Sequence, residues 1–430
     1  MTAGRSILRE RDLAVLVTAS FVSVVGDTAA LIALTLRLHA HGSGGWTIAA
    51  LLLAGSAPMV LLSPLAGAVA DRLDSRLAIA GSALAQAACA FALAHVSGLG
   101  STLVLVALLT SAGTLVGPSV GALVPRTVAP GRLVSANALL QGAFVGGNLF
   151  GPIVGGLLTG AWGSRAPLEL DAATFLLVAA GIFVVRTRRD PRRDGVDAVR
   201  RSGFRIAWDD RLLRAVIGAL SALVLVSGAV NVAEVFLVKD ALHATDTVFG
   251  VISASWMLGM VAGAALTPRF GRSTAELLRT MAGAQVVMAG GLVAAGVSPT
   301  WPVAAAAFVV GGVGNGALSV ACRTVVVQRV PDAVRGRVLG VMSGSINAAS
   351  VAAFGAGGIL VSVVGPRWTV AGSGTAAVVV ALAFARSARR SGWSSQGQRV
   401  VGSASTNRGE ECGPDRYTTL SRPPSATPSS

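Results

Sequence analysis

The sequence predicts an all-α integral membrane protein in which twelve transmembrane helices form two six-helix halves related by pseudo-twofold symmetry. Only 13% of the 430 residues are charged, whereas roughly 25% is usual for a soluble domain. The mean hydropathy of +0.69 points the same way. Apolar runs of about 20 residues, the length that crosses a hydrocarbon core of about 30 Å, recur along the chain. The bilayer is therefore the expected solvent.

Six apolar runs form the expected first half, residues 13–185, behind a cytoplasmic N-terminus at 1–12. These runs lie at about 13–36, 46–69, 77–96, 102–123, 138–160 and 168–185. A connector at 186–212 is too polar and too rich in arginine to enter lipid. It is expected on the cytoplasmic side of the membrane.

Six further runs form the expected second half, residues 213–387. They lie at about 213–238, 247–267, 277–297, 302–325, 338–362 and 367–386. The pair Val124-Pro125 recurs as Val330-Pro331 about 205 residues later, which indicates a duplicated unit. The tail at 388–430 is rich in Ser, Arg, Gly and Pro and is expected to be disordered.

The basic residues predict the orientation, because cytoplasmic loops carry an excess of Lys and Arg. One set of connections holds Arg5, Arg9, Arg11, Arg72, Arg76, Arg126, Arg132, Arg269, Arg272, Arg279, Arg329, Arg335, Arg337, Arg386, Arg389 and Arg390. The opposite set holds only Arg37, Arg165, Lys239 and Arg367, and Trp46, Trp162, Trp301 and Trp368 fall at the same boundary. We expect a multi-pass protein of the inner or plasma membrane with both termini cytoplasmic.

Several function classes are disfavoured. The net charge of +15 lies in short loops rather than on one face, so no nucleic acid partner is expected. Lys239 is the one lysine and does not follow a glycine, which excludes a P-loop. The three cysteines show no metal or disulfide spacing, and no hydrolase or metalloenzyme motif occurs. We therefore expect no cofactor, no metal and no enzyme activity.

The end of the second run carries a loop motif, Gly67-Ala-Val-Ala-Asp71-Arg72-Leu-Asp-Ser-Arg76. It resembles the Gly-x-x-x-Asp-(Arg/Lys)-x-Gly-(Arg/Lys)-(Arg/Lys) motif of the major facilitator superfamily, with matches at Gly67, Asp71, Arg72 and Arg76. The resemblance implies a cytoplasmic gate whose charges pair in one conformation and separate in the other. The alternative is a plain positive-inside turn.

The fifth run carries Gly147-x-x-x-Gly151-Pro152-x-x-Gly155-Gly156. It resembles the antiporter motif that exporters of this superfamily carry in this helix, and that resemblance implies drug-proton antiport. Small residues at this spacing make a flat helix face, and the proline permits a bend. The alternative is generic small-residue packing.

Further stretches are similar to the branch of the superfamily that contains macrolide and enterobactin exporters. They are Pro118-x-x-x-Ala-Leu-x-Pro125, Leu133-x-x-Ala-Asn-Ala138, Ser23-x-x-Gly-Asp27 and Gly336-Arg-Val338. The fourth run departs from many proton-coupled exporters because it lacks an internal arginine.

Two intramembrane carboxyl groups are functional candidates, since a central Asp costs about 2.5–3.5 kcal/mol to insert. Asp27 lies past the middle of the first run and Glu234 in the outer part of the seventh, at nearly equivalent places in the repeat. We expect them to line a central cavity and to exchange protons against a cationic or polar substrate, because burial favours a protonated carboxyl. Two alternatives remain: Asp27 hydrogen-bonds Ser23 or Thr28, and Glu234 pairs with Lys239.

The function implied by the resemblance is secondary active transport. We expect proton-coupled efflux of a hydrophobic or cationic small molecule, such as a drug or secondary metabolite, by alternating access. The expected partners are this substrate, protons and membrane lipid, and the resemblance suggests a monomer. An importer or a lipid flippase of the same fold, and a membrane receptor or scaffold that does not transport, are the alternatives.

Overall fold

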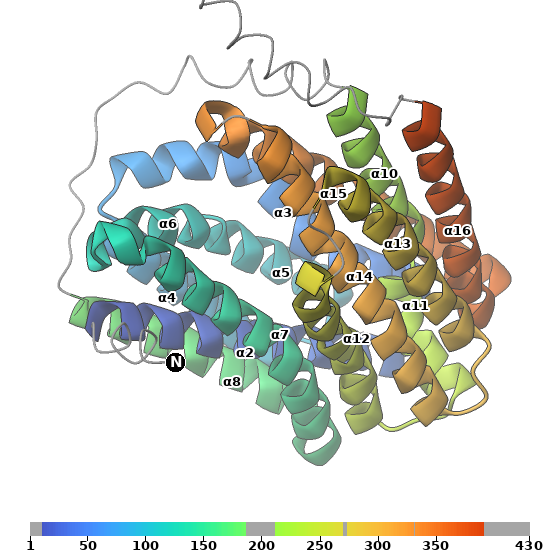
Figure 1. Cartoon of the computed structure of the whole chain (residues 1–430). Helices are drawn as coiled ribbons and strands as arrows, with labels where there is room; N and C mark the ends of the chain where they lie inside the picture. Colours follow the sequence, from blue (N-terminus) through green and yellow to red (C-terminus); the bar gives the residue numbers. More distant parts are fainter. Residues whose placement is uncertain (1–10, 186–210, 270–272, 331, 391–430) are drawn as a thin grey trace, which may run out of the picture.

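The computed structural model describes residues 11–185, 211–269, 273–330 and 332–390. Figure 1 shows a bundle of long helices, and no strand occurs in the described residues. Twelve helical stretches in these ranges are long and apolar enough to cross a membrane. The predicted all-helical fold with twelve spans is confirmed. Most of the predicted N-terminal segment, connector and tail lies outside the described residues.

The first half contains six spans made of seven α-helices. In chain order these elements are α2 (Arg11–Ala40), α3 (Gly45–Arg72), α4 (Ser75–His95), α5 (Leu99–Gly113), α6 (Val116–Thr127), the short η1 (Pro130–Arg132), α7 (Leu133–Trp162) and α8 (Arg165–Val184). The fourth span is broken between α5 and α6. There the Thr114 hydroxyl donates to the carbonyl of Ser111 at 2.6 Å, and such a local side-chain bond competes with the helical ladder.

The second half also contains six spans. Its elements are α10 (Arg211–Ser227), α11 (Val230–Phe236), η2 (Leu237–Ala241), α12 (Asp246–Leu266), η3 (Thr267–Arg269), α13 (Thr274–Gly296), α14 (Trp301–Arg329), α15 (Asp332–Val364) and α16 (Pro366–Arg390). The seventh span breaks at Gly228, where a Cβ would lie 2.5 Å from the Cβ of Ala353 on α15. It ends in η2, a wider π-helical turn.

One turn has the same backbone conformation in both halves. Gly163 ends α7 with φ 79°, and Gly365 separates α15 from α16 with φ 81°. Glycine adopts this left-handed conformation without the steric penalty of a Cβ. Each glycine follows the fifth span of its half, so the chain reverses direction before the sixth span at a left-handed glycine in both halves.

Side chains cap three helices at their first turns. Asp74 accepts a hydrogen bond from the amide of Arg76 at 2.8 Å at the start of α4, and Thr245 caps α12. Ser273 and Glu276 form a reciprocal capping box at the start of α13. The cap explains why the loop motif has Asp74 at a position where the resembled pattern has glycine.

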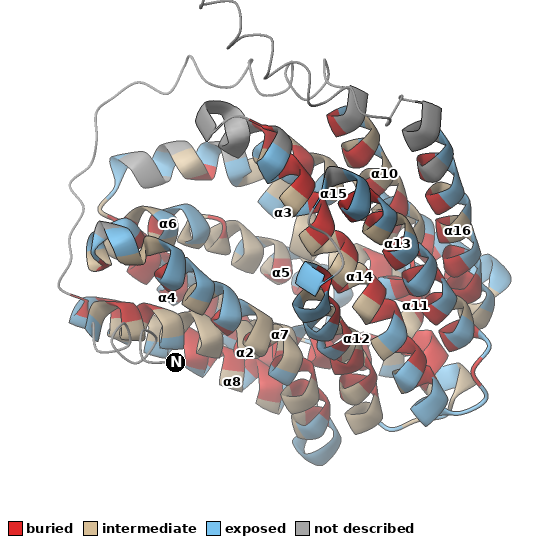
Figure 2. Cartoon of the chain, in the orientation of Figure 1, coloured by how far each residue is buried: buried red, intermediate tan, exposed pale blue. Residues whose placement is uncertain are grey.

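The outward-facing sides of the helices are apolar and exposed (Figure 2). Leu61, Leu177 and Val379 are among the large aliphatic side chains left uncovered by the bundle. A soluble monomer rarely exposes continuous apolar surface of this extent, whereas lipid covers it in a membrane. The chain is a multi-pass membrane protein.

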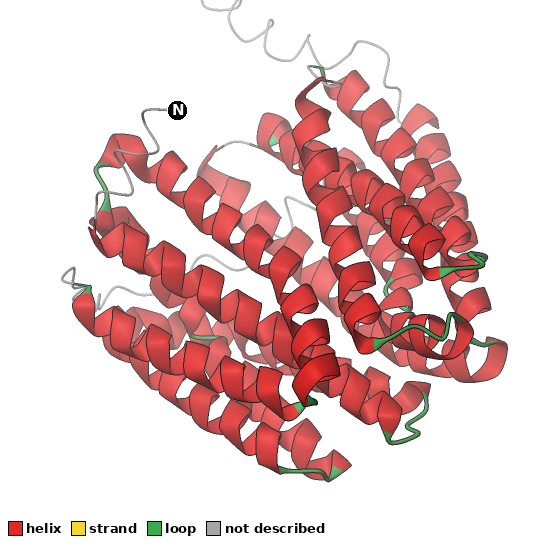
Figure 3. Cartoon of the chain, turned by 90° about the horizontal axis from the view of Figure 1, so that it is seen from below, coloured by secondary structure: helices red, strands yellow, loops and turns green. Residues whose placement is uncertain are grey.

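We call the two ends of the bundle the proximal face and the distal face. The proximal face holds the start of α2 and the turns at 73–74 and 128–129, and the distal face holds the turns at 41–44, 163–164, 242–245 and 365. Short turns join the helices at both ends of the bundle (Figure 3). Trp46, Trp162, Trp301 and Trp368 lie exposed at helix ends on the distal face.

The two halves meet at the distal face. One buried apolar cluster includes Leu34 and Leu36 from α2, Ile48 from α3, and much of α10–α16. A separate cluster holds the proximal ends of the first half, including Leu13, Ile79 and Ile182, with no member from α10–α16. Apolar packing therefore joins the halves distally and leaves them apart at the proximal end.

Candidate functional site

A central cavity of about 690 Å³ lies between the two halves. Helices α2, α3 and α7 form one wall, and helices of the second half form the other. Its polar lining residues are Thr28, Thr35, Asn148, Ser227, Asn231, Glu234, Ser253, Asn315, Ser319, Arg323, Ser343, Asn347 and Ser350. The volume suits a small organic molecule. Its walls reach Arg323 and Ser343 near the proximal ends of α14 and α15.

Glu234 is the acidic residue of the central cavity, and Arg323 is its basic residue, among the described lining residues. The break at Gly228 precedes α11, which carries Glu234. The hydroxyl of Ser253 on α12 donates to Oε1 of Glu234 at 2.5 Å. Lys239 does not pair with Glu234 in this structure. Its ammonium group binds Asp246 instead, at 2.7 Å.

Aromatic and thioether side chains also line the central cavity. Trp256 and Phe308 meet edge to face with ring centroids 6.0 Å apart, and Met257 and Met288 line the same cavity. Aromatic faces attract cations, and methionine adapts its shape to irregular apolar ligands. The described lining therefore combines one carboxyl group, one guanidinium group, several neutral amides and a soft apolar wall.

A second cavity of about 690 Å³ is lined by helices of the first half and by Phe354 of α15, and we call it the N-half cavity. Its walls are mostly aliphatic side chains of α2, α3, α4, α5 and α6. Asp27 and Asp171 are its acidic lining residues. Ser23, one helical turn before Asp27, lines the same cavity.

Asp171 is a candidate that the sequence interpretation did not single out. It lies on α8 and is only 1% exposed. The available signal was its position inside the apolar run 168–185, because an acidic residue within a span is a functional candidate by default.

Asp27 and Glu234 lie in different cavities, although the sequence suggested that they approach each other across one. Leu31, Leu52 and Phe354 line both cavities and so form the wall between them. Asp27 therefore lines one of two adjoining cavities and Glu234 lines the other.

The glycine motif of α7 forms two contact surfaces. The first faces α2: a Cβ on Gly147 would lie 2.6 Å from the Val24 Cβ, and one on Gly155 would lie 2.7 Å from the Ala29 Cα. Gly151 belongs to the same surface and lies against the side chain of Thr28. Residues four apart share one helix face, so these three glycines form one stripe within the first half.

The second surface of α7 faces α12 in the other half. A Cβ on Gly156 would lie 2.7 Å from the carbonyl oxygen of Asp246, and the Pro152 carbonyl packs against Gly250. We call the contact between Pro152, Gly156, Asp246 and Gly250 the α7–α12 seam. The close approach of two backbones explains why these positions require small residues.

The loop motif lies at the proximal end of the first half. Arg72 ends α3, and the side chain of Asp71 is outside the described part of the structure. Arg76 donates from Nη2 to the carbonyl of Phe183 at 2.9 Å and from Nε to that of Ile182 at 3.3 Å. No atom of the described residues comes within 4 Å of a Cβ placed on Gly67. The described residues therefore make no close helix contact at Gly67.

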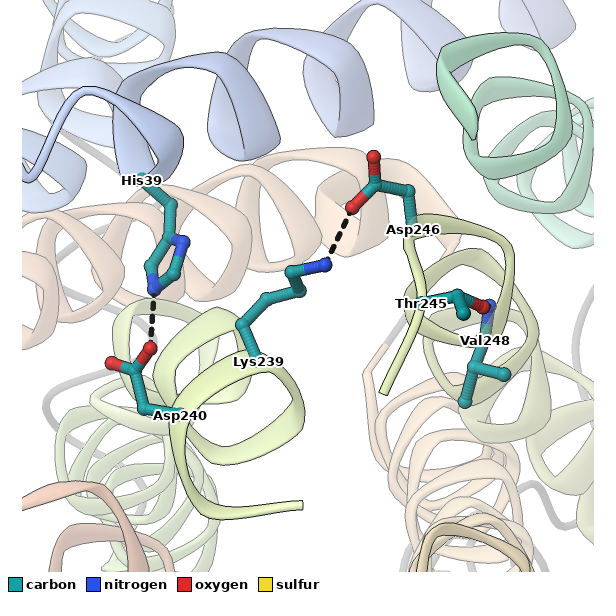
Figure 4. A network of polar contacts seen from close by, with 6 residues as sticks. All are labelled: His39, Lys239, Asp240, Thr245, Asp246 and Val248. Atoms are coloured by element: carbon teal, nitrogen blue, oxygen red, sulfur yellow. Dashed lines mark hydrogen bonds and ion pairs between the residues drawn. The ribbon is translucent and has the colours of Figure 1, made fainter. Parts of the chain in front are cut away.

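Polar contacts also join the halves at the distal face (Figure 4). The His39 ring, at the end of α2, lies 2.9 Å from the Asp240 carboxylate on η2. The neighbouring pair of Lys239 and Asp246 stays within the second half. Only the first pair therefore bridges the halves.

Comparison with known proteins agrees with this architecture. Residues 16–277 and 237–424 match the sequence profile of the Major Facilitator Superfamily. The multidrug resistance protein MdtG of Proteus mirabilis is 24% identical over 286 residues, which cover 65% of this chain and 70% of that protein. The MFS-type transporter YfiS of Bacillus subtilis, whose function is uncharacterized, is 23% identical over 83% of this chain and 88% of its own.

Two solved structures share the fold. The nucleoside transporter NupG superposes with a TM-score of 0.70 at 15% identity, covering 87% of this chain and 98% of its own. A bacterial homologue of the iron transporter ferroportin superposes with a TM-score of 0.68 at 18% identity, covering 88% and 98%. With twelve spans, a cavity between two halves and a profile match over most of its length, the chain belongs to the Major Facilitator Superfamily and is a secondary transporter, not an enzyme.

Proposed function

We propose that the protein exports hydrophobic, cationic compounds from the cell in exchange for protons. The orientation follows from the arginines: Arg72, Arg76, Arg126 and Arg132 all lie at the proximal face, which the positive-inside rule makes cytoplasmic. On this assignment both termini are cytoplasmic and the protein lies in the cell membrane. The conformation is inward-facing, since the halves pack together at the distal face.

The observation that carries the proposal is the position of Glu234. Glu234 lines the same central cavity as the aromatic pair of Trp256 and Phe308, and Ser253 is its hydrogen-bond partner. A carboxylate beside aromatic faces attracts an organic cation both by charge and by cation–π contact. The MdtG relatives, which are named multidrug resistance proteins, support the same substrate class.

In the proposed cycle, substrate enters from the cytoplasm while the α7–α12 seam is closed. The seam then opens, the proximal ends come together, and the substrate leaves distally. Asp27 carries the exchanged proton, while Gly67, Asp71, Arg72 and Arg76 gate the proximal face. The glycine stripe of Gly147, Gly151 and Gly155 keeps α7 attached to α2, and Pro152 and Gly156 form the surface that separates.

The substrate class is tested by ligand binding to the purified protein in nanodiscs. Ethidium serves as the cationic probe, and an uncharged aromatic compound of similar size serves as the neutral one. Replacing Glu234 by Gln removes the charge but keeps the shape. We expect ethidium affinity to fall about 10- to 100-fold, because a hydrogen-bonded charge contributes roughly 1.5–3 kcal/mol.

The neutral probe and a matched variant act as controls. Affinity for the neutral probe should change less than about twofold in Glu234→Gln. Glu169→Gln makes the same charge change at an exposed position on α8 and should leave both affinities intact. Equal losses for both probes, or no loss for ethidium, would remove Glu234 as the cation anchor.

Two further experiments separate the alternatives. The direction of ethidium movement in right-side-out and inverted vesicles distinguishes an exporter from an importer or flippase. Truncation after Arg390 separates a carrier from a receptor or scaffold that signals through its tail. An exporter should keep its transport rate without residues 391–430, whereas a scaffold should lose its function.

A further inference from the structure

The carboxyl group of Asp171 is buried without a hydrogen-bond partner on one of its oxygens. In the described structure Oδ1 of Asp171 has no such partner, and the residue is 1% exposed. The oxygen packs against α2 at a glycine: a Cβ on Gly26 would lie 2.6 Å from it. A side chain at this position would push the carboxylate away, so Gly26 allows Asp171 to reach α2.

Asp27 follows Gly26 directly, so both acidic residues stand at the same contact between α2 and α8. Both groups line the N-half cavity. Ser23, one helical turn before Asp27, lines the same cavity, and the Thr174 hydroxyl donates to the backbone carbonyl of Asp171 at 2.8 Å. Two acidic side chains and two hydroxyl groups therefore converge where α2 packs on α8.

No basic side chain balances these acids among the described residues that line the cavity. Arg37 is engaged near the distal end, where it donates to the Leu93 carbonyl at 2.8 Å. Arg76 is engaged near the proximal end, as described above. Glu234 lines the central cavity instead.

The other titratable groups on α2, α8 and the helices packed against them do not line this cavity. The α7 segment Leu133–Trp162 contains no ionisable residue. Glu169 is exposed. The remaining ionisable residues whose side chains are described are Arg11, Asp12, His39, Arg72, Cys89, His95, Arg126 and Arg165.

Two like charges cannot both persist at short range in an apolar chamber without a counter-ion. A small cation must therefore accompany the pair. Metal ions are disfavoured, because no group of three or more His, Cys, Asp or Glu in the described residues is arranged to hold one. A proton needs no further ligands, because two carboxylates alone can hold it, as in other carboxyl pairs that share one proton.

We propose that Asp27 and Asp171 form one proton site, in which the two carboxyl groups share a single proton, and that this pair is the coupling element of the exporter. The inference rests on the proposed proton exchange and adds a second residue to it. In the inward-facing state the shared proton leaves toward the cytoplasm, and the repulsion between the two bare carboxylates makes that state short-lived. In the outward-facing state a proton from outside restores the pair.

The packing of α2 links this site to the seam. Gly26 contacts Asp171 on α8, whereas Thr28 and Ala29 contact Gly151 and Gly155 on α7. Loss of the shared proton makes the carboxylates repel and separates α2 from α8. Because α7 is packed on α2, the displacement reaches the other face of α7, which forms the seam.

The site is tested first without substrate, by infrared difference spectroscopy of the full-length protein in nanodiscs during a pH titration. The wild type should show a C=O band of a protonated carboxyl group that disappears as the pH rises. Asp27→Asn and Asp171→Asn should each change the frequency of the band, and the double variant should lack it. Glu169→Gln should leave the band unchanged.

Gly26→Ala provides a second variant, because it displaces the Asp171 carboxylate without removing it. The band should change in this variant too, which keeps the site testable if Asp171→Asn does not fold. A band that is identical in the wild type, Asp171→Asn and Gly26→Ala would overturn the shared site. If NaCl at constant pH removes the band and choline chloride does not, the pair binds Na⁺. That result would overturn the claim that a proton occupies the site.

Transport then tests the coupling. Ethidium flux driven by a pH gradient should fall at least about tenfold in either single variant and no further in the double variant, because the two residues act as one unit. If the losses of ethidium flux in the two single variants add up in the double variant, the two residues do not share one proton. If the wild type transports no ethidium, the proposed function fails, whereas the infrared titration still decides the site.

Discussion

Gly156 on α7 and Gly250 on α12 bring the two halves of the protein into backbone contact. A Cβ on Gly156 would lie 3.1 Å from the Cα of Gly250. The contact lies toward the distal ends of both helices, where the halves are packed together. Opening the distal face requires these two backbones to separate, so side-chain size at the seam controls the balance between the two states.

Enlarging the seam should favour the state in which the distal face is open. Gly156→Val introduces overpacking that costs roughly 1–3 kcal/mol in the closed seam and nothing in the open one, which shifts the populations about 5- to 100-fold. Spin-label distances between the distal ends of α7 and α12 report the shift. Gly142→Val is the matched control on the same helix, because no described atom lies within 4 Å of its Cβ position. An equal distance distribution in both variants would contradict the role of the seam.

The glycine stripe toward α2 should affect stability rather than the conformational balance. Gly151→Ala forces a methyl group against the Thr28 side chain within the first half. We expect the free energy of unfolding to fall by about 1–3 kcal/mol. Thr28→Ala in the same protein should recover part of this loss, since it removes the colliding atoms. Thermal unfolding in detergent is measured for the wild type, the two single variants and the double variant, which together form a double-mutant cycle. Purely additive losses of stability would show that Thr28 and Gly151 do not interact.

The His39–Asp240 pair should contribute only slightly to closure of the distal face. It bridges the halves at 2.9 Å, but the side chain of Asp240 is 55% exposed. Exposed ion pairs contribute about 0–1 kcal/mol, so Asp240→Asn should raise the open population less than about fivefold. Lys239→Met breaks the neighbouring pair within the second half and should leave the population unchanged. Single-molecule distance measurements distinguish the two, and an equal effect of both variants would argue against a bridge.

Arg76 should stabilise the proximal end of the first half. Its guanidinium group donates to the carbonyls of Ile182 and Phe183 in the last turn of α8, where helix carbonyls lack backbone partners. Arg76→Ala should therefore lower the free energy of unfolding by about 1–3 kcal/mol. Arg72→Ala, at the exposed end of α3, serves as the comparison. If Arg76 acts only as a gate, the transport rate will fall while the thermal stability of Arg76→Ala matches that of the wild type.

The twelve spans could be predicted from the sequence because lipid imposes one simple rule, a long apolar run for each crossing. The repeat and the face that carries the arginines follow from equally local features. The breaks at Thr114 and Gly228 could not be read in this way. They arise from a side-chain hydrogen bond and from the approach of α15, neither of which hydropathy reports.

The residues of the candidate site stand out in the sequence one by one, but their arrangement does not. Glu234 and Asp27 stand out as charges inside apolar runs, and both line cavities. Their separation by Leu31, Leu52 and Phe354 depends on how the halves pack, which one sequence does not reveal. Asp171 satisfies the same rule as Asp27, and its contact with Gly26 is visible only when α8 is placed beside α2.

Substrate-driven proton movement in proteoliposomes tests the proposed transport most directly. Wild-type protein is reconstituted with a pH indicator inside the vesicles, and ethidium is added outside without any imposed gradient. Proton-coupled exchange predicts a pH change inside that requires ethidium, is lost in Asp27→Asn and persists in Glu169→Gln. Ethidium uptake without any pH change in the wild type would contradict proton exchange, and the absence of uptake in either direction would contradict export of organic cations.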